Sequence, residues 1–314
     1  MRLAYIVLAY KLPSQAIRLV RKLSDDGVTF FVHVDRKTPD DVYDEIVTGL
    51  RDTPRVEWLT RRRCYWSGFG IVAAMLEAID RIAGDPGGFE YTTSLTADTY
   101  PLRSNNEIRK YLRSLNGRSV LEHALFPGAG LTGGGLDRIE RWHWPNVLGH
   151  HVSFPNRRVN VPLKRRFPAG LQPHSGSGGW CLSWDCVRHI AGFVAANPRF
   201  VRFFKHVFAP DESFFQTIVL NSRFADSLVN DDLRYVDWSG PHPLPKTLTT
   251  ADFDALMAAG DLFARKFDIR RDAEILDLLD QAIARREVST DPLQISLGMR
   301  RDAVQLEVSP DDEL

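Results

Sequence analysis

The first half of the chain alternates short, continuous apolar runs with stretches in which apolar residues recur every three or four positions. Continuous runs are typical of strands buried on both faces of a parallel sheet, whereas the longer spacing predicts amphipathic helices. The pattern predicts strands at 3–9, 28–34, 55–60, 90–96 and 119–125, and helices at 13–24, 39–50, 71–82 and 105–115, the last capped by Asn105. Such alternation indicates an α/β domain with a mostly parallel, Rossmann-like sheet flanked by helices.

Periodicity is lost between residues 127 and 178, a segment rich in Gly, Pro, Arg, His and Trp. A segment of this length is typical of a functional excursion over the active face. Regular patterns then return, predicting strands at 179–183 and 233–238 and helices at 184–196, 210–220, 249–259 and 272–284. The chain after about Glu287 has weak periodicity, and we expect a loosely attached tail at 287–314.

Composition excludes several classes of protein. The 314 residues are 44% hydrophobic, which is enough for one large or two intimate domains. Lys+Arg and Asp+Glu both number 40, so the formal net charge is zero and no nucleic-acid partner is expected. No apolar run reaches about 18 residues, so no membrane span is expected and any membrane contact would be peripheral. No cleavage site follows the apolar N-terminal run, which favours a buried strand and a cytoplasmic protein.

Two common cofactor motifs are present only in weak form. Gly68-Phe-Gly-Ile-Val-Ala73 matches a dinucleotide-binding fingerprint, but it follows the third strand and not the first. A tight turn at a helix start is favoured, and an NAD-dependent oxidoreductase is the weaker alternative. The three cysteines, Cys64, Cys181 and Cys186, lack the C-x-x-C spacing of a zinc site or an even count for disulfides. Buried, reduced thiols are expected.

One D-x-D sequence could hold a metal that bridges the phosphates of a nucleotide sugar. Asp252-Phe-Asp254, however, follows Thr249 at the start of a helical run. Thr249-x-x-Asp252 has the spacing of a capping box, in which the acidic side chain and the hydroxyl satisfy backbone N–H groups. Helix capping is therefore favoured over metal binding. His143, His150 and His151 lack acids at metal-ligand spacing and are expected to be loop histidines.

Three segments carry charged residues that could bind a nucleotide or take part in catalysis. Asp35 ends the second predicted strand, where it could bind a nucleotide or cap the loop. Glu212 follows Pro210 in the first turn of a predicted helix, where the helix dipole favours an ionised carboxylate suited to general-base catalysis; simple charge complementation is the alternative. Lys246 and the pair Arg265-Lys266 could clamp a diphosphate, or could be solvated surface charges.

Together these segments resemble the family of core-2/I-branching β-1,6-N-acetylglucosaminyltransferases and peptide O-xylosyltransferases, glycosyltransferase family 14. The resemblance covers residues 3 to 280 and looks like a bacterial-type member without the membrane anchor and disulfides of secretory relatives. It rests on the order and spacing of AYIVLAYKLPSQAIRLVRKL, FFVHVDRK, YWSGFG, SLTADTYPLRSNNEI, GSGGWCLSWDCVRHI, FAPDESFFQTIVLNS, LRYVDWSGPHPLPKTLTTADFDAL and LFARKFD.

The resemblance implies a GT-A type α/β fold and an inverting, metal-independent transfer of GlcNAc or xylose from a UDP-sugar to an acceptor hydroxyl. It implies one catalytic domain at 1–286, with a nucleotide-sugar-binding half at 1–126 and an acceptor and catalytic half at 127–286. No cofactor is expected beyond the UDP-sugar co-substrate, and the acceptor is a glycan or another hydroxyl-bearing molecule. The implied general base is Glu212, the donor-binding residues are Ala9, Asp35, Lys37, Lys246, Arg265 and Lys266, and the acceptor-binding residues are Glu140, Arg141, Trp180 and Trp238.

Two departures from the family pattern bear on this assignment. Relatives carry an Asp directly before Tyr-Pro, whereas this chain reads Asp98-Thr99-Tyr100-Pro101, so the carboxylate is displaced by one position and would point the other way in a strand. The W-G-G-x-S sequence of relatives is replaced by the looser Trp66-Ser67-Gly68-Phe69-Gly70. The displaced carboxylate leaves open an alternative, a catalytically silent nucleotide- or sugar-binding domain that partners another transferase.

Overall fold

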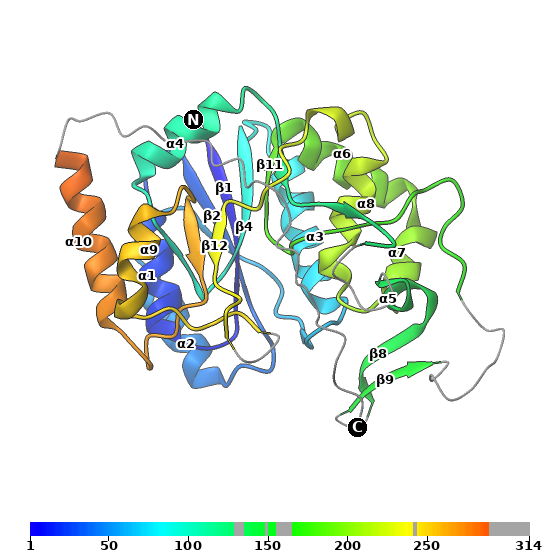
Figure 1. Ribbon diagram of the computed structural model, residues 1–314, viewed down its shortest axis with the longest axis horizontal. Coiled ribbons are helices and arrows are strands. Elements are labelled where there is room, and N and C mark those ends of the chain that lie inside the picture. The colour runs from blue at the N-terminus through cyan, green and yellow to red at the C-terminus, as the bar shows by residue number, and fades with distance from the viewer. Residues whose placement is uncertain (129–134, 148–149, 155–164, 241–243, 289–314) are drawn as a thin grey trace, which may run out of the picture.

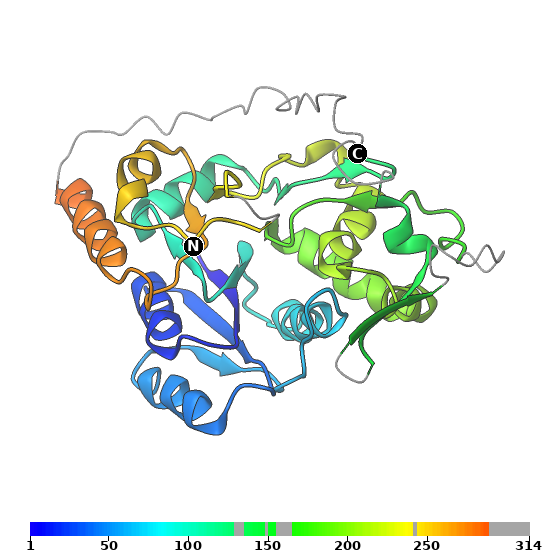
Figure 2. The ribbon, with the colours of Figure 1, turned by 60° about the horizontal axis from the view of Figure 1, so that its bottom comes forward.

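The central sheet has six strands in the order β3-β2-β1-β4-β11-β6 (Figure 1 and Figure 2). The computed structural model describes residues 1–128, 135–147, 150–154, 165–240 and 244–288. The strands β3 (Val56–Trp58), β2 (Val28–Val34), β1 (Leu3–Ala9) and β4 (Tyr91–Thr96) are parallel to one another, and β11 (Trp180–Ser183) is antiparallel to both β4 and β6 (Val120–Leu121). The predicted α/β class with a mostly parallel sheet is confirmed.

Alternate side chains of β1 enter two separate hydrophobic cores, one on each face of the sheet. Tyr5 and Val7 belong to the core that the first group of helices covers, whereas Ala4 and Ile6 belong to the other. Because both faces are buried, the strand reads as a continuous apolar run. The first face is covered by α1 (Pro13–Leu23), α2 (Asp40–Gly49), α4 (Asn105–Ser114), α9 (Phe253–Ala258) and α10 (Glu274–Val288), and the second by α3 (Gly70–Ala83), α6 (Trp184–Ala196), α7 (Pro198–Phe204) and α8 (Phe214–Leu220).

A smaller sheet lies beside the carboxyl end of β4. It consists of β12 (Arg234–Val236), β13 (Phe263–Arg265) and β5 (Thr99–Pro101), with β13 parallel to β12 and antiparallel to β5. Because β5 begins three residues after β4 ends, this sheet brings the late segment 263–265 to the carboxyl edge of the central sheet. In Figure 1, β12 lies beside the central strands on the side of α9.

Two predicted helix starts need correction. Ser104, and not Asn105, is the N-cap of α4: its hydroxyl accepts the Glu107 N–H at 3.2 Å and its own N–H donates to the Glu107 carboxylate at 2.8 Å. The helix expected from residue 210 is divided into a short 3-10 turn, Pro210–Glu212, and α8, which begins at Phe214. Glu212 therefore does not lie in the first turn of an α-helix. The capping box of Thr249 and Asp252 is confirmed.

The segment that lacks periodicity contains short elements. They are α5 (Asp137–Glu140), the hairpin of β8 (Trp142–Val147) and β9 (His150–Phe154), and β10 (His174–Ser175). The strand expected at 119–125 is two strands of different sheets, because β6 joins the central sheet while β7 (Ala124–Leu125) pairs with β10. The expected tail at 287–314 lies outside the described residues beyond Val288.

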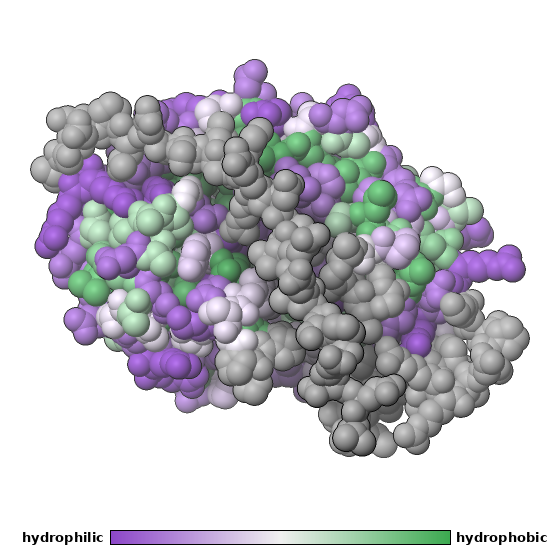
Figure 3. Space-filling view, in the orientation of Figure 1, coloured by the Kyte–Doolittle hydropathy of each residue, from purple (hydrophilic) through white to green (hydrophobic). Residues whose placement is uncertain are grey.

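Hydrophobic residues are not confined to the interior. Figure 3 shows a face whose outer rim is largely hydrophilic, with hydrophobic patches nearer its middle. Within the described ranges, no helix combines the length and apolar character that a membrane crossing would need.

Candidate active site

The carboxyl ends of β1 and β2 form one wall of the candidate site. Asp35 follows β2, is 5% exposed, and its backbone N–H donates to the Ala9 carbonyl at 2.9 Å. Its carboxylate accepts the N–H groups of Lys37 at 2.8 Å and Cys64 at 3.3 Å. The Lys37 ammonium lies 3.5 Å from the same carboxylate and over the Tyr65 ring. Asp35 therefore caps its own loop, and Ala9, Asp35 and Lys37 are brought together at the sheet edge; nucleotide binding by Asp35 stays a prediction.

His33, two residues before Asp35 on β2, links the end of this strand to the segment that contains Arg62. The Nε2 atom of His33 accepts the Arg62 N–H at 3.1 Å, which requires a neutral imidazole in that tautomer. Burial lowers the pKa of His33 and favours the same neutral form. Asp35 thus projects from a rigid position at the carboxyl edge of the sheet.

The end of β4 places an acid against a cation. Arg265 lies opposite Thr99 in the smaller sheet, and its guanidinium is 3.3 Å from the Asp98 carboxylate. Burial would raise the pKa of Asp98, but the Arg265 cation and the Thr96 hydroxyl outweigh it, and the pKa is lowered. The displaced carboxylate is therefore ionised and paired with Arg265, whose neighbour Lys266 follows directly in the chain.

Lys246 pairs with other carboxylates than Arg265 does. Its ammonium lies 2.5 Å from the Asp252 carboxylate and 3.5 Å from that of Asp237. The hydrogen bond to Asp252 raises the pKa of Lys246, so the ammonium stays protonated. Its positive charge is balanced by the neighbouring carboxylates. Trp238, next to Asp237, is 63% exposed on the same loop. The structure thus joins Lys246 to the helix cap of the D-x-D sequence and not to the Asp98–Arg265 pair.

Glu212 is held on a turn between two other segments. Its Oε2 atom accepts a hydrogen bond from Arg138 Nη1 at 2.6 Å, and its backbone carbonyl accepts the Gly176 N–H at 2.8 Å. Arg138 belongs to α5, and its backbone carbonyl accepts the Phe208 N–H at 3.0 Å. The sequence predicted that a helix dipole would stabilise the Glu212 carboxylate, whereas in the structure the Arg138 guanidinium contacts it. No local pattern marks this pair, because 74 residues separate its members.

Asp211 precedes Glu212 and is the second acid of the turn. Burial, together with the adjacent Glu212 charge, raises the pKa of Asp211 to about 6. The backbone packs closely here, since a Cβ at Gly178 would lie 3.1 Å from the Asp211 carboxylate.

Trp180 is a correction to the expected acceptor-binding residues. It lies in β11, has no exposed surface and packs against Phe215 with ring centroids 5.4 Å apart. The apolar requirement of a central strand therefore explains this tryptophan, and the structure gives it no face toward an acceptor. Trp66 begins the W-S-G-F-G sequence that departs from the family's W-G-G-x-S pattern. It is 73% exposed, and its ring contacts Phe208 edge-on.

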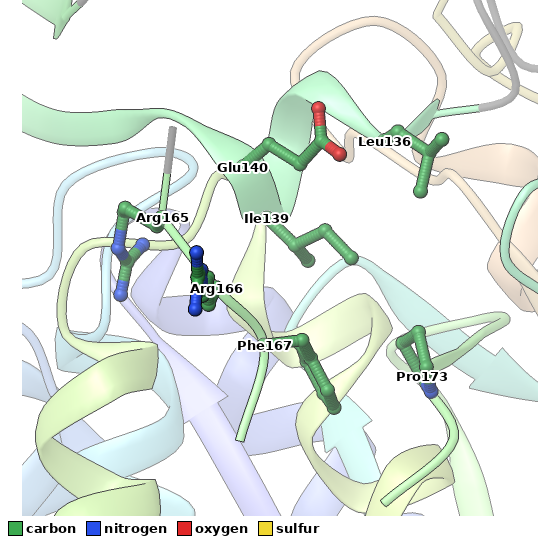
Figure 4. Close-up of a pocket in the computed structure, with 7 residues that line it drawn as sticks. All are labelled: Leu136, Ile139, Glu140, Arg165, Arg166, Phe167 and Pro173. Atoms are coloured by element: carbon green, nitrogen blue, oxygen red, sulfur yellow. The ribbon is translucent and has the colours of Figure 1, made fainter. Parts of the chain in front are cut away.

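A pocket of about 540 Å³ lies beside α5. Figure 4 shows Leu136 and Ile139 on one side and Phe167 on another, with Glu140 and Arg166 as charged groups around it. Arg165 forms part of the wall, but its guanidinium donates to backbone carbonyls, including that of Arg141 at 3.2 Å and that of His206 at 2.7 Å. The pocket is lined by Leu136, Ile139, Glu140, Arg165, Arg166, Phe167 and Pro173. Of the two candidate acceptor residues in this segment, Glu140 lines the pocket, and Arg141 contacts the wall residue Arg165 through its backbone carbonyl.

Cysteine and metal chemistry have no assembled site in the part of the chain that the structure describes. All three cysteines are free thiols, with Cys181 and Cys186 buried and Cys64 partly exposed. In the same described ranges, no three His, Cys, Asp or Glu side chains gather in a way that could hold a metal ion.

Comparison with known proteins gives a consistent family. The sequence model of the family described as "Branch: Core-2/I-Branching enzyme" matches residues 3–257. Xylosyltransferase 2 of Rattus norvegicus is 26% identical over 309 residues, which cover 89% of this chain and 33% of the relative. Beta-glucuronosyltransferase GlcAT14B of Arabidopsis thaliana is 26% identical, with 90% of this chain and 66% of the relative covered.

The chain thus spans about a third of the length of the xylosyltransferases that it matches. Among solved structures, mouse xyloside xylosyltransferase 1 in its apo form is similar at a TM-score of 0.38 and 13% identity, covering 83% of this chain and 97% of that one. The family match extends over most of the chain and includes the segments that carry Asp35, Asp98, Arg138 and Glu212. By that match the chain belongs to the Core-2/I-Branching enzyme family of glycosyltransferases.

Proposed function

We propose that this protein transfers a sugar from a UDP-sugar to an acceptor hydroxyl with inversion at the anomeric carbon, and that Glu212 is the general base. The observation that carries the proposal is the placement of Glu212 on a turn fixed to α5, the helix that also lines the pocket of about 540 Å³. A base must lie within reach of the proton that it removes, and we propose that the acceptor hydroxyl approaches Glu212 from the side of α5.

In the proposed step the acceptor oxygen attacks the anomeric carbon while its proton passes to the Glu212 carboxylate. The bond between the anomeric carbon and the donor's phosphate oxygen breaks, and UDP leaves with the electron pair. Ala9, Asp35 and Lys37 lie at the carboxyl ends of the first two strands, the edge at which open α/β sheets bind ligands. We assign the uridine to this edge.

Stabilisation of the negative charge on the leaving diphosphate is the second part of the proposal. Arg265 ends β13 opposite Thr99 of β5, and Lys266 follows it, so both could stabilise the phosphate oxygens as charge develops in the transition state. Arg265 already pairs with Asp98, so that its guanidinium is oriented before the donor binds. Transfer without a divalent metal is proposed on this basis. Lys246 would have to leave Asp252 to take part, and we assign it a structural role instead.

The donor sugar is proposed from the relatives. Their names specify xylose and glucuronic acid transfer, and the E-S-F-F-x-T segment that begins at Glu212 leans toward xylosyltransferases. UDP-xylose is therefore the first donor to test, followed by UDP-GlcNAc and UDP-glucuronate.

The first experiment measures thermal stability of the purified chain with UDP in excess EDTA. A ligand at about 100 times its dissociation constant adds roughly 2.7 kcal/mol to the free energy of unfolding, which is visible as a raised Tm. Stabilisation that requires Mn²⁺ would contradict metal independence, and no stabilisation under either condition would contradict a UDP site.

The second experiment follows release of UDP from each donor, with and without candidate acceptors. Glu212→Gln should lower turnover by about 10²–10⁴-fold, the usual worth of general-base catalysis, and should leave UDP binding intact. Glu57→Gln is the matched control, because Glu57 is exposed on the edge strand β3 and also faces an arginine. UDP binding without turnover of any donor would favour the silent binding domain.

A further inference from the structure

Arg138 makes the closest side-chain contact to Glu212. The Nη1–Oε2 distance is 2.6 Å, in the range of a strong charge-assisted hydrogen bond. Among the residues that the structure describes, no hydrogen bond reaches Oε1 of Glu212. One carboxylate oxygen is thus held by Arg138, whereas the other accepts no hydrogen bond from the described residues and remains able to take up a proton.

The helix that carries Arg138 is itself anchored to the segment leading to the Glu212 turn. The Arg138 carbonyl accepts the Phe208 N–H at 3.0 Å, and the Arg138 guanidinium lies 5.6 Å from the centre of the Phe208 ring. At the end of the helix, the Glu140 carbonyl accepts the Arg165 N–H at 2.8 Å. A short helix of four residues therefore has a fixed position from which Arg138 can hold a partner.

Glu212 needs such a partner because its side chain has several rotatable bonds and its turn is a short 3-10 helix. A side chain of this kind loses considerable rotamer freedom when a single geometry is imposed. Catalysis depends steeply on that geometry: a displacement of about 1 Å can cost about 10²-fold in rate. The guanidinium group suits this task, because its planar array of N–H donors binds a carboxylate in a defined orientation.

We propose that Arg138 is a positioning residue, which orients the Glu212 carboxylate so that Oε1 receives the acceptor proton. The inference rests on the proposed function of Glu212. It also gives the pocket a role in the reaction, since Ile139 and Glu140 of the same helix line it. An acceptor that occupies the pocket contacts the helix that sets the orientation of the base.

A double-mutant cycle tests the inference. Arg138→Gln alone should lower kcat by about 10²-fold with little change in the KM for the donor. In the Glu212→Gln background the same substitution should change turnover by less than about threefold, because the group that it orients is already absent. Arg138→Lys should retain part of the activity, and added guanidinium ion should partly rescue Arg138→Ala.

The assay is hydrolysis of a radiolabelled donor, in which water replaces the acceptor, so that no acceptor need be known. Arg199→Gln on α7 is the control for loss of an exposed arginine. Equal losses from Arg138→Gln in both backgrounds would overturn the inference, because a structural role or a direct substrate contact would act independently of Glu212. A wild-type protein that turns over no donor either by hydrolysis or with any candidate acceptor would instead overturn the proposed function.

Discussion

Asp211 offers a quantitative test of the electrostatics around the Glu212 turn. Burial and the neighbouring Glu212 charge raise the pKa of Asp211 to about 6, whereas a carboxyl of this type in an unfolded chain titrates near 3.8. The folded state therefore binds the proton more tightly than the unfolded state. The stabilising contribution of protonated Asp211 is fully present below about pH 4, and it is lost as the pH rises through about 6.

The magnitude follows from the size of the shift. One pKa unit corresponds to 1.36 kcal/mol, so a shift of about two units gives an upper limit of about 3 kcal/mol. Partial exposure of Asp211 to solvent reduces that limit, and about 1–3 kcal/mol is expected. The Asn side chain of Asp211→Asn is uncharged at every pH and nearly isosteric with Asp. The variant should therefore lack the loss of stability that ionised Asp211 causes as the pH rises.

Urea denaturation at pH 4.5 and at pH 7.5 measures the effect. Because the unfolded carboxyl is already largely ionised at pH 4.5, this range captures at most about 2 kcal/mol of the limit, and Asp211→Asn should gain about 1–2 kcal/mol over wild type in the free energy of unfolding between the two pH values. Asp211→Ala should show the same change with pH at a lower absolute stability, which separates charge from packing. If wild type and Asp211→Asn change in parallel over this range, the raised pKa of the partly buried Asp211 carboxyl is not the cause.

Three further predictions concern the framework of the site. Ser104→Ala should destabilise the protein by about 1 kcal/mol in urea denaturation, since it removes the α4 capping box; no loss would mean that the cap adds nothing in this context. Arg265→Gln should cost about 2 kcal/mol at pH 7 by leaving ionised Asp98 without its cation, and the cost should fade as the pH falls below about 4 because Asp98 then takes up a proton; a cost that persists at low pH would contradict this cause. Gly176→Ala should lower Tm and donor turnover together, because its Cβ would lie 1.8 Å from the Glu122 carbonyl oxygen beside the segment that binds the Glu212 backbone; unchanged values would contradict the close approach.

The sequence predicted well the elements whose signals are local. The strands β1, β2 and β4 are buried on both faces and read as continuous apolar runs, and α1 shows its buried stripe at helical spacing. The capping box at Thr249 was also readable, because its two partners lie three residues apart. The family resemblance also named Glu212 and Lys266 as candidate site residues, and their roles stay predictions.

Long-range partners could not be read from the sequence. Arg138 and Glu212 are 74 residues apart, and Arg265 and Asp98 are 167 apart, so each pair exists only through the topology. The burial of Trp180 has the same cause, because its strand enters the central sheet between β4 and β6. Strands of two residues, such as β7 and β10, are too short for any periodicity.

The insertion of β13 between β12 and β5 has a consequence for the order of folding. Contacts between residues far apart in the chain form slowly, because a long loop must first close. During synthesis the segments for β1 to β4 emerge long before residue 265, so Asp98 at the end of β4 must wait for the cation that balances it. The nascent first half of the chain therefore lacks the cation that completes this edge, and the Asp98–Arg265 pair can form only after residue 265 has been synthesised.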